Sequence, residues 1–448
     1  MIWTALDTWI VVAAVLAGVT CALVGSFLVL KKMSMLGDAI SHAVLPGIAV
    51  AFMLTASHAG GTMFVGAAIV GVLTAMLVEV IHHHGKIEHG AAMGVVFSIF
   101  FAIGLILIEH AARNVDIHPD HVLMGAVELV PLTNVSIGGL AVPRGVVVLA
   151  VMLLIDGAVV TALFKELRIA IFDPDLATTL GINATFMHYL LMTLVAMTTV
   201  AAFEVVGSIL VIAMLIVPGA TAWLLTRRLL PFIITSVTIA AAAAVGGHVA
   251  AITVPPLFGF EDTSTAGSMA VVLGFLFFLA FLLAPERGLV IQGWNRLRLR
   301  ISINTQDALG LLARSAERQG NQEGNLSAGE FQAARRSPFA GRTPQLIATL
   351  SLLRLRGSVR LRRGRYYAST HGATTGRNIL RTHRLLERYF YDDAQVRIDE
   401  LHNAADYLEH YTDQTLQAEL ANQLRQRETD PRGNLIPRET TDGDSTGV

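Results

Sequence analysis

The sequence contains little cysteine and few charged residues. Cys21, which lies in an apolar run, is the single cysteine among 448 residues. This count excludes a disulfide scaffold and a metal cluster built on cysteine. Charged residues make up 15% of the chain, hydrophobic residues make up 53%, and the mean hydropathy is +0.58. That combination argues against a disordered chain, a collagen-like repeat and an ordinary soluble enzyme.

Lysine is also scarce, and the chain lacks the phosphate-binding loop of ATPases. Such a loop needs a Gly-Lys pair followed by Ser or Thr. The lysines are Lys31, Lys32, Lys86 and Lys165, and the one that follows a glycine, Lys86, precedes Ile87. The chain therefore encodes no P-loop ATPase, and any pumping must use a partner subunit or an ion gradient.

The formal net charge of −1 combines two parts of opposite character. Residues 1–289 contain 10 basic and 16 acidic side chains, whereas residues 290–448 contain 23 basic and 18 acidic ones, and all 23 are arginine. We predict a membrane domain over 1–289, a linker over 290–303, a polar domain over 304–437 and a disordered tail over 438–448.

The first part contains nine apolar windows of about the length that a membrane-spanning helix needs, roughly 20 residues. They are Trp9–Leu30, Ala39–Ala56, Thr62–Ile81, Ala91–Ile108, Gly145–Phe164, Phe186–Ala202, Val205–Leu225, Phe232–Ile252 and Gly267–Ala284. The first window lacks a preceding basic segment and an Ala-x-Ala cleavage pattern, so we expect a retained helix. The predicted fold class is all-α, a polytopic helical membrane bundle, with a re-entrant or interfacial piece within 110–144.

Basic residues in the short loops predict the orientation. One set of loops carries eight of them, and the alternating set carries only Arg113 and Arg144. The eight are Lys31, Lys32, Lys86, Lys165, Arg168, Arg227, Arg228 and Arg287. Because cytoplasmic loops are enriched in Lys and Arg, we expect an outside N-terminus, nine crossings and a cytoplasmic polar domain.

Asp38 and His42 are the foremost candidates for function, since an intramembrane charge is costly unless it is paired or binds a ligand. They lie four residues apart and therefore share one face of a helix. A carboxylate with an imidazole suits Mn²⁺, Fe²⁺ or Zn²⁺ better than Mg²⁺ or Ca²⁺. The alternative is an Asp–His pair that satisfies only itself at a helix end.

Proline and glycine interrupt two windows that are expected to run in opposite directions. The interruptions are Leu45-Pro46-Gly47 and Val217-Pro218-Gly219. Paired breaks of this kind indicate a transport site near the midplane of the membrane, and packing alone is the alternative explanation.

Several other ionisable residues are weaker candidates. Glu204, His248 and Asp262 are candidate path residues on the outer side, with a helix-end or loop role as the alternative. His82-His83-His84 with His89 is typical of a metal-binding tract on the cytoplasmic side, and a solvated loop is the alternative.

Residues 164–181 form a cytoplasmic segment that is well suited to docking a partner. Asp173-Pro174 predicts the start of a short helix, and Gly181 predicts its end. A simple connector would not need this length or its mixture of apolar and charged residues. Asp173, Pro174, Asp175 and Gly181 are therefore candidates for contact with an ATPase.

Three blocks of the first part resemble the membrane subunits of ABC importers for Mn²⁺, Zn²⁺ and Fe²⁺. They are KKMSMLGDAISHAVLPGIAVAFML (31–54), EVVGSILVIAMLIVPGATAWLL (204–225) and GGHVAAITVPPLFGFEDTSTAGSMAVVLGFLFFLAFLLAPERG (246–288). The resemblance covers residues 8–288 and implies a homodimeric or heterodimeric permease of a bacterial inner membrane. It implies a cytoplasmic ATPase and an extracytoplasmic metal-binding protein as partners. It also implies that Asp38 and His42 lie on the metal path, and the SHAVLPG form is more similar to the manganese/iron branch.

The polar domain begins with a pattern that predicts a winged helix-turn-helix. Helices are expected over Gln306–Ser315, Ser327–Arg335 and Thr343–Leu355, followed by β-like runs over Ser358–Arg362 and Arg365–Ser369. Thr343 is expected to be the N-cap of the third, recognition helix.

Twelve arginines and no acidic residue occupy 331–386, which favours contact with phosphates. The candidate nucleic-acid contacts are Arg342, Thr343, Gln345 and Arg354. Contact with anionic membrane lipid and a merely solvated face are the alternatives.

The end of the polar domain contains metal ligands at helical spacing. His383 and Glu387 lie four residues apart, and the next helix carries one stripe of four residues. The stripe is His402, Asp406, Glu409 and His410. Six nitrogen and oxygen donors on two helices suit Mn²⁺ or Fe²⁺, and a charged solvated face is the alternative.

This half resembles the iron- and manganese-dependent repressors over residues 304–437. The likeness rests on THRLLERYF (382–390), LHNAADYLEH (401–410) and ETDPRGNLIP (428–437). It implies a primary metal site of Asp307, His383, Asp406, Glu409 and His410, and an accessory site of His383, Glu387 and His402. Two positions depart from the family: Gly310 stands where manganese-type members have a second carboxylate, and Asp406 stands where Cys or Glu is usual.

The expected function is therefore that of a non-enzymatic permease subunit of an ATP-driven importer of divalent metal, Mn²⁺ before Fe²⁺ or Zn²⁺. The metal would be substrate and regulatory ligand, and the fused domain would sense cytoplasmic metal or assist dimerisation. A membrane-tethered, metal-responsive transcriptional regulator that binds DNA is the alternative, and a gradient-driven carrier is a third.

Overall fold

The chain forms two compact units, Met1–Gln292 and Gly293–Val448. The computed structural model describes residues 3–55, 60–111, 127–137, 140–259, 263–321, 323–334, 338–412, 414–424 and 427–438. The expected linker at 290–303 is helical and belongs to α14 (Leu289–Gln319). Apart from Arg438, the expected tail lies outside the described residues.

Within the described part of the first unit, nine segments are long and apolar enough to cross a membrane, which confirms the nine predicted windows. They are α1 (Ala5–Leu30), α2 (Leu36–Ala43) together with α3 (Leu45–Thr55), α4 (Gly60–Gly85), α5 (His89–Ala111), α7 (Arg144–Ala162), α10 (Ala184–Val206), α11 (Ser208–Leu225), α12 (Leu229–Thr253) and α13 (Thr265–Leu283). Apart from α2, these helices carry apolar residues around the whole circumference, as helices buried in lipid and protein must; α2 is amphipathic and carries Asp38 and His42 on its polar side.

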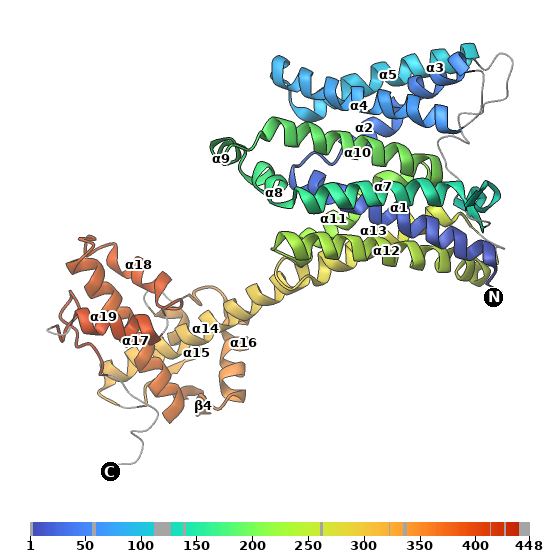
Figure 1. The fold of residues 1–448 in the computed structure, drawn as a ribbon. Helices are drawn as coiled ribbons and strands as arrows, with labels where there is room; N and C mark the ends of the chain where they lie inside the picture. The colour runs from blue at the N-terminus through green and yellow to red at the C-terminus, as the bar shows by residue number, and fades with distance from the viewer. Residues whose placement is uncertain are drawn as a thin grey trace. The chain divides into compact units, whose positions relative to one another are not determined.

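Two inner helices organise this unit. α1 packs against α7, α10, α11 and α12, and α10 also packs against α2 and α4. Figure 1 shows α10 between the group α2–α5 and the group that contains α1, α11, α12 and α13. The outer helices α4, α5 and α13 are buried over less than a third of their apolar windows, so their remaining surface is available to lipid.

One of the two expected helix interruptions is present. α2 ends at Ala43 and α3 begins at Leu45, so the break before Pro46 is confirmed. α11 continues through Pro218 without interruption, so the second prediction is wrong. Gly219 lets α11 lie close to α1, because a Cβ there would approach Val29 Cγ2 to 3.0 Å. In a membrane, neighbouring helices and local adjustment allow a proline to remain within a helix.

The stretch 110–144 contains short elements among its described residues. They are η2 (Val127–Leu132), β1 (Asn134–Ile137) and β2 (Leu140–Pro143), and the two strands pair as an antiparallel hairpin. η2 packs on α1 and α13, and Glu128 Oε1 accepts a hydrogen bond from Thr265 N over 2.7 Å. This segment is thus attached to one end of the bundle.

The expected docking helix is α9 (Pro174–Thr179), which follows α8 (Phe164–Phe172). Asp173 is its N-cap and accepts a hydrogen bond from Leu176 N over 2.9 Å. Gly181 has a φ of +80°, a conformation that favours glycine after a helix. The predicted start and end are confirmed.

The second unit combines helices with a small antiparallel sheet of order β3-β5-β4. After α14 its elements are β3 (Asn325–Ser327), α15 (Ala328–Ala333), α16 (Thr343–Leu355), β4 (Val359–Arg362), β5 (Arg365–Ala368), α17 (Thr370–Asp392), α18 (Leu401–Leu408) and α19 (Gln414–Gln423). Leu312, Phe331, Phe339 and Leu346 are fully buried in one core that joins α14, α15 and α16. The short strand β3 was not predicted.

The start of α16 differs from the prediction. Arg342, not Thr343, is the N-cap, and its side chain makes no capping hydrogen bond. Thr343 Oγ1 instead accepts a hydrogen bond from Gln332 Nε2 of α15 over 2.8 Å, which fixes the turn between the helices. β4 and β5 form a hairpin through Arg363 and Gly364, whose φ values of 50° and 77° suit a tight two-residue turn.

We predict that Gly66→Ala destabilises the first unit by about 1–3 kcal/mol, because overpacking forces neighbouring backbones apart. A Cβ at Gly66 would clash with the carbonyl oxygen of Gly47 and lie 2.7 Å from Ala51 Cβ. Gly61→Ala, on the same helix with nothing within 4 Å, is the matched control. Thermal unfolding in detergent measures the effect, and equal unfolding temperatures of the two variants would refute the close α3–α4 contact.

Candidate metal sites

Asp38 and His42 lie one turn apart on α2, immediately before the helix break. His42 Nε2 is 3.4 Å from Asp38 Oδ1, and both side chains are partly exposed. The imidazole also lies against Phe97 and Phe101 of α5, with ring centroids 5.5 and 6.0 Å away. The pair therefore presents an oxygen and a nitrogen donor beside an aromatic wall, and it has free capacity to bind a cation.

The remaining path candidates do not join this pair. Glu204 forms an ion pair of 3.3 Å with Arg144. His248, only 2% exposed, lies 3.4 Å from Asp7 Oδ1 and 3.3 Å from Thr265 Oγ1. Each thus has a partner of its own, while Asp262 lies outside the described residues.

Sequence reasoning missed Asp156 of α7. Its side chain is fully buried, and Thr198 of α10 donates a hydrogen bond to its Oδ2 over 2.6 Å. The available signal was a single carboxylate in the middle of the window Gly145–Phe164, which the rule for intramembrane charges identifies as a candidate.

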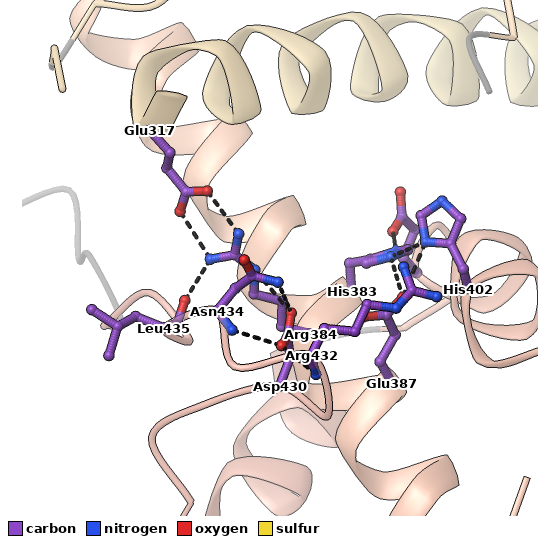
Figure 2. A network of polar contacts seen from close by, with 10 residues as sticks. Glu317, His383, Arg384, Glu387, His402, Asp430, Arg432, Asn434 and Leu435 are labelled. Atoms are coloured by element: carbon purple, nitrogen blue, oxygen red, sulfur yellow. Dashed lines mark hydrogen bonds and ion pairs between the residues drawn. The ribbon is translucent and has the colours of Figure 1, made fainter. Parts of the chain in front are cut away.

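In the second unit, His383 is the centre of a buried cluster. Its Nδ1 donates to Glu409 Oε2 over 2.5 Å, and its Nε2 lies 3.2 Å from Glu387 Oε1 and 2.7 Å from His402 Nδ1. His402 also bonds to Glu387 Oε1 over 3.0 Å. Figure 2 shows His383, Glu387 and His402 facing one another.

Three sets of residues place one ligand atom each within 4.8 Å of the others. They are His383 with Glu387 and His402, Asp307 with Glu409 and His410, and His383 with Asp406 and Glu409. The structure therefore brings together all seven residues named from the repressor resemblance. The first set consists of the same three residues as the expected accessory site, whereas the five residues of the expected primary site fall into the other two sets. Asp307 joins His410 over 3.0 Å, whereas Asp406 is exposed and 4.0 Å from His383 Nδ1.

The imidazoles and carboxylates of this cluster shift one another's pKa values. Burial alone would lower the pKa of His383, but its hydrogen bonds to Glu387 and Glu409 raise that pKa above the ordinary value. Burial would likewise raise the pKa of Glu387, but hydrogen bonds from His383 and His402 hold it below its ordinary range. A divalent cation that bound to these residues would take the place of the proton between the imidazole and the carboxylates, and that proton would be released.

A second network of hydrogen bonds is centred on Arg384, which follows His383 on α17. Arg384 donates to both carboxylate oxygens of Glu317 over 2.9 and 2.7 Å and to the carbonyl oxygen of Leu435. Asp430 accepts hydrogen bonds from Asn434 over 2.7 and 2.8 Å (Figure 2). The segment 427–438 is thereby fastened to α17 and α14.

The nucleic-acid candidates lie along α16. Arg342, Thr343 and Arg354 are exposed, whereas Gln345 is half-buried and donates a hydrogen bond to Asn304 Oδ1 over 3.0 Å. Three of the four are therefore accessible to a partner, and Gln345 has a structural role in joining α16 to α14.

The ATPase-docking candidates frame an exposed apolar surface. Leu167, Ala170, Ala177 and Met187 form a small core beneath α8 and α9. Above it, Phe172, Leu176 and Leu180 are 61%, 47% and 60% exposed. Asp173 caps the start of α9 and Gly181 follows its end, so both residues fix the helix that carries Leu176.

Two protein families match the chain. Residues 5–284 match the ABC 3 transport family. Residues 369–438 match the metal binding and dimerisation domain of the iron dependent repressors.

Similar proteins cover the first unit. The manganese transport system membrane protein MntD of Bacillus subtilis is 42% identical over 295 residues, 66% of this chain and 97% of that protein. The zinc transport system membrane protein TroD of Treponema pallidum is 37% identical over 281 residues, 63% of this chain and 75% of that protein. The structure of PsaBC from Streptococcus pneumoniae in complex with Fab shares 31% identity and a TM-score of 0.52, over 63% of this chain and 94% of that chain.

The family match, the coverage of MntD and the nine apolar segments all indicate the same family of membrane proteins. The chain is a membrane protein of the ABC 3 transport family that carries a metal-binding and dimerisation domain of the iron dependent repressor type at its C-terminal end.

Proposed function

We propose that this chain is the permease subunit of an ATP-driven importer of divalent transition metal, with Mn²⁺ preferred and Fe²⁺ or Zn²⁺ next. The observation that carries the proposal is the Asp38–His42 pair at the broken helix of a nine-span bundle. Mixed oxygen and nitrogen donors suit these metals. The greater identity to MntD than to TroD, 42% against 37%, supports manganese.

We infer that the energy comes from a separate ABC ATPase, since this chain has no P-loop. The exposed apolar side chains of α8 and α9 support docking there. The loop charges support an outside N-terminus and a cytoplasmic second unit. A binding protein outside the membrane would deliver the metal, and a second permease subunit would complete the path.

The second unit is proposed to sense cytoplasmic metal and to reduce transport when metal is abundant. The three ligand sets and the match to the repressor domain support this role. The exposed Arg342, Thr343 and Arg354 favour a second candidate function, metal-dependent DNA binding by a membrane-tethered regulator. Specific DNA binding by the full chain, dependent on added Mn²⁺, is the measurement that supports it.

We expect Asp38→Ala to reduce ATP-dependent Mn²⁺ uptake by the reconstituted complex at least about tenfold, because the path loses a metal-binding carboxylate. Uptake is measured with Fe²⁺ and Zn²⁺ as competitors, which ranks the metals. Glu286→Gln, which removes an exposed carboxylate paired with Arg227, is the control. Unchanged uptake by Asp38→Ala would contradict the transport role.

Asp173→Ala should weaken co-purification of the ATPase, because loss of an N-cap costs a helix about 1 kcal/mol and α9 then holds its apolar side chains less firmly. Asp173→Ser keeps a capping oxygen and should retain the ATPase. If the serine variant loses the ATPase as well, Asp173 acts by direct contact and not as a cap.

For the sensor, loading the cytoplasmic side with Mn²⁺ should slow uptake by the unaltered complex. The double variant Asp406→Ala/His410→Ala should transport equally fast at high and low cytoplasmic Mn²⁺, because two of the ligand sets lose a member. Inhibition that persists in the double variant would show that the second unit does not sense metal through these residues.

A further inference from the structure

A groove in the second unit lies between the first half of α14 and the end of α16, and none of the functions proposed above uses it. The groove has a volume of about 550 Å³. It is lined chiefly by Trp294, Leu297, Arg298 and Ile301 of α14 and by Leu352 and Arg356 of α16. The sequence predicted 290–303 only as a linker, so this wall of a groove was not expected there.

The apolar wall of the groove is one stripe of α14. Trp294, Leu297 and Ile301 follow one another at intervals of three and four residues, which places them on one face of the helix. Trp294 is 66% exposed and Leu297 is 51% exposed. Removing this apolar surface from water would be favourable, and exposed apolar surface on such a stripe is typical of a binding site.

Arginines border this stripe on both sides. Arg298 follows Trp294 by four residues and Arg300 follows Leu297 by three, so the two flank the apolar residues on opposite sides. Arg356 adds a third positive charge from α16, and all three arginines are exposed. Within the described ranges, no carboxylate forms an ion pair with any of them.

The charge of this surface is positive because acidic residues are absent from both segments that form it. No Asp or Glu occurs within 288–306 or within 331–386. The groove therefore fits a ligand that has an anionic group and an apolar part. Guanidinium groups bind phosphates well, and the stripe of α14 needs an apolar chain to cover it.

Other occupants satisfy one of these two requirements and not the other. A nucleic acid supplies phosphates but has no aliphatic chain for Leu297 and Ile301. A second copy of this chain would bring its own arginines against these arginines, and like charges across an interface are costly. A phospholipid with an anionic headgroup supplies both the phosphate and the chain.

The groove also begins close to the membrane along the chain. The last apolar segment, α13, ends at Leu283, and α14 begins at Leu289, so only residues 284–288 separate them. Trp294 is then about 8 Å further along α14, at 1.5 Å per residue. That length is comparable with the thickness of the headgroup layer, so membrane lipid is the ligand nearest to hand.

We propose that the groove between α14 and α16 binds an anionic phospholipid. Its acyl chain lies against Trp294, Leu297 and Ile301, and its phosphate lies between Arg298 and Arg356. The inference goes beyond the proposed function, because it requires that the first unit spans a membrane but does not require metal transport.

The test uses Trp294 as a reporter in the full chain. Trp3, Trp9 and Trp223 are replaced by Phe, which leaves Trp294 as the single tryptophan. This parent protein is placed in nanodiscs of phosphatidylcholine that contain an increasing fraction of phosphatidylglycerol with brominated acyl chains, which quench tryptophan emission on contact. Brominated phosphatidylglycerol should quench Trp294 at a several-fold lower mole fraction than brominated phosphatidylcholine does.

Arg298→Gln/Arg356→Gln should raise the mole fraction of brominated phosphatidylglycerol needed for half-maximal quenching at least about fivefold, because arginines near an anionic surface strengthen binding to it. Arg360→Gln/Arg362→Gln is the matched control. It removes the same charge from exposed positions of β4 that do not line the groove, and it should be quenched like the parent.

Three results would overturn the lipid site. Equal quenching of the parent by the two brominated lipids would remove the preference for an anionic headgroup. An equal effect of the two double variants would reduce the binding to general charge attraction. Absence of quenching by either lipid would show that Trp294 is covered by protein, either another part of this chain or a second copy.

Discussion

A charge inside a lipid bilayer has no water to solvate it, and this constraint arranges the ionisable residues of the first unit. Five of the described ones lie next to polar partners: Asp38 with His42, Glu79 with His188, Asp156 with Thr198, Glu204 with Arg144, and His248 with Asp7. All but the first pair join residues from different helices. These contacts therefore add polar links between helices to the apolar packing of the bundle.

The same constraint makes the α2 pair distinctive. Asp38 and His42 belong to one helix, remain partly exposed and stand at a break in the backbone. Neither residue is needed to join two helices, so their donors are free for a substrate. The buried pairs between helices have an additional structural function, and this separates the proposed path residues from Glu204 and His248.

In the second unit, the ionisable residues are not surrounded by lipid, and they form a larger shared cluster instead of separate pairs. His383 and Glu409 each belong to two of the three candidate ligand sets, so a metal bound by one set would change the ligands available to another. Arg384, the next residue along α17, connects the cluster with Glu317 of α14 and with the segment near Leu435. A metal that shifted α17 would therefore also move the Glu317 contact on α14, the helix that begins at the end of the first unit.

Hydropathy, helix-capping residues and helical spacing were sufficient to predict the nine spans, α9 and α16 and to single out the candidate ligands between His383 and His410, because these features depend on neighbours in the chain. The extra strand β3, the N-cap of α16 and the pairing of Glu79 with His188 depend on distant residues: Tyr366 lies opposite Leu326, Gln332 bonds to Thr343, and Glu79 and His188 come from different helices. The sequence by itself thus determined which residues are apolar, helical or able to bind metal. Only the tertiary structure decided which of those ligands meet, because a metal site forms where side chains from separate helices converge within a few ångströms.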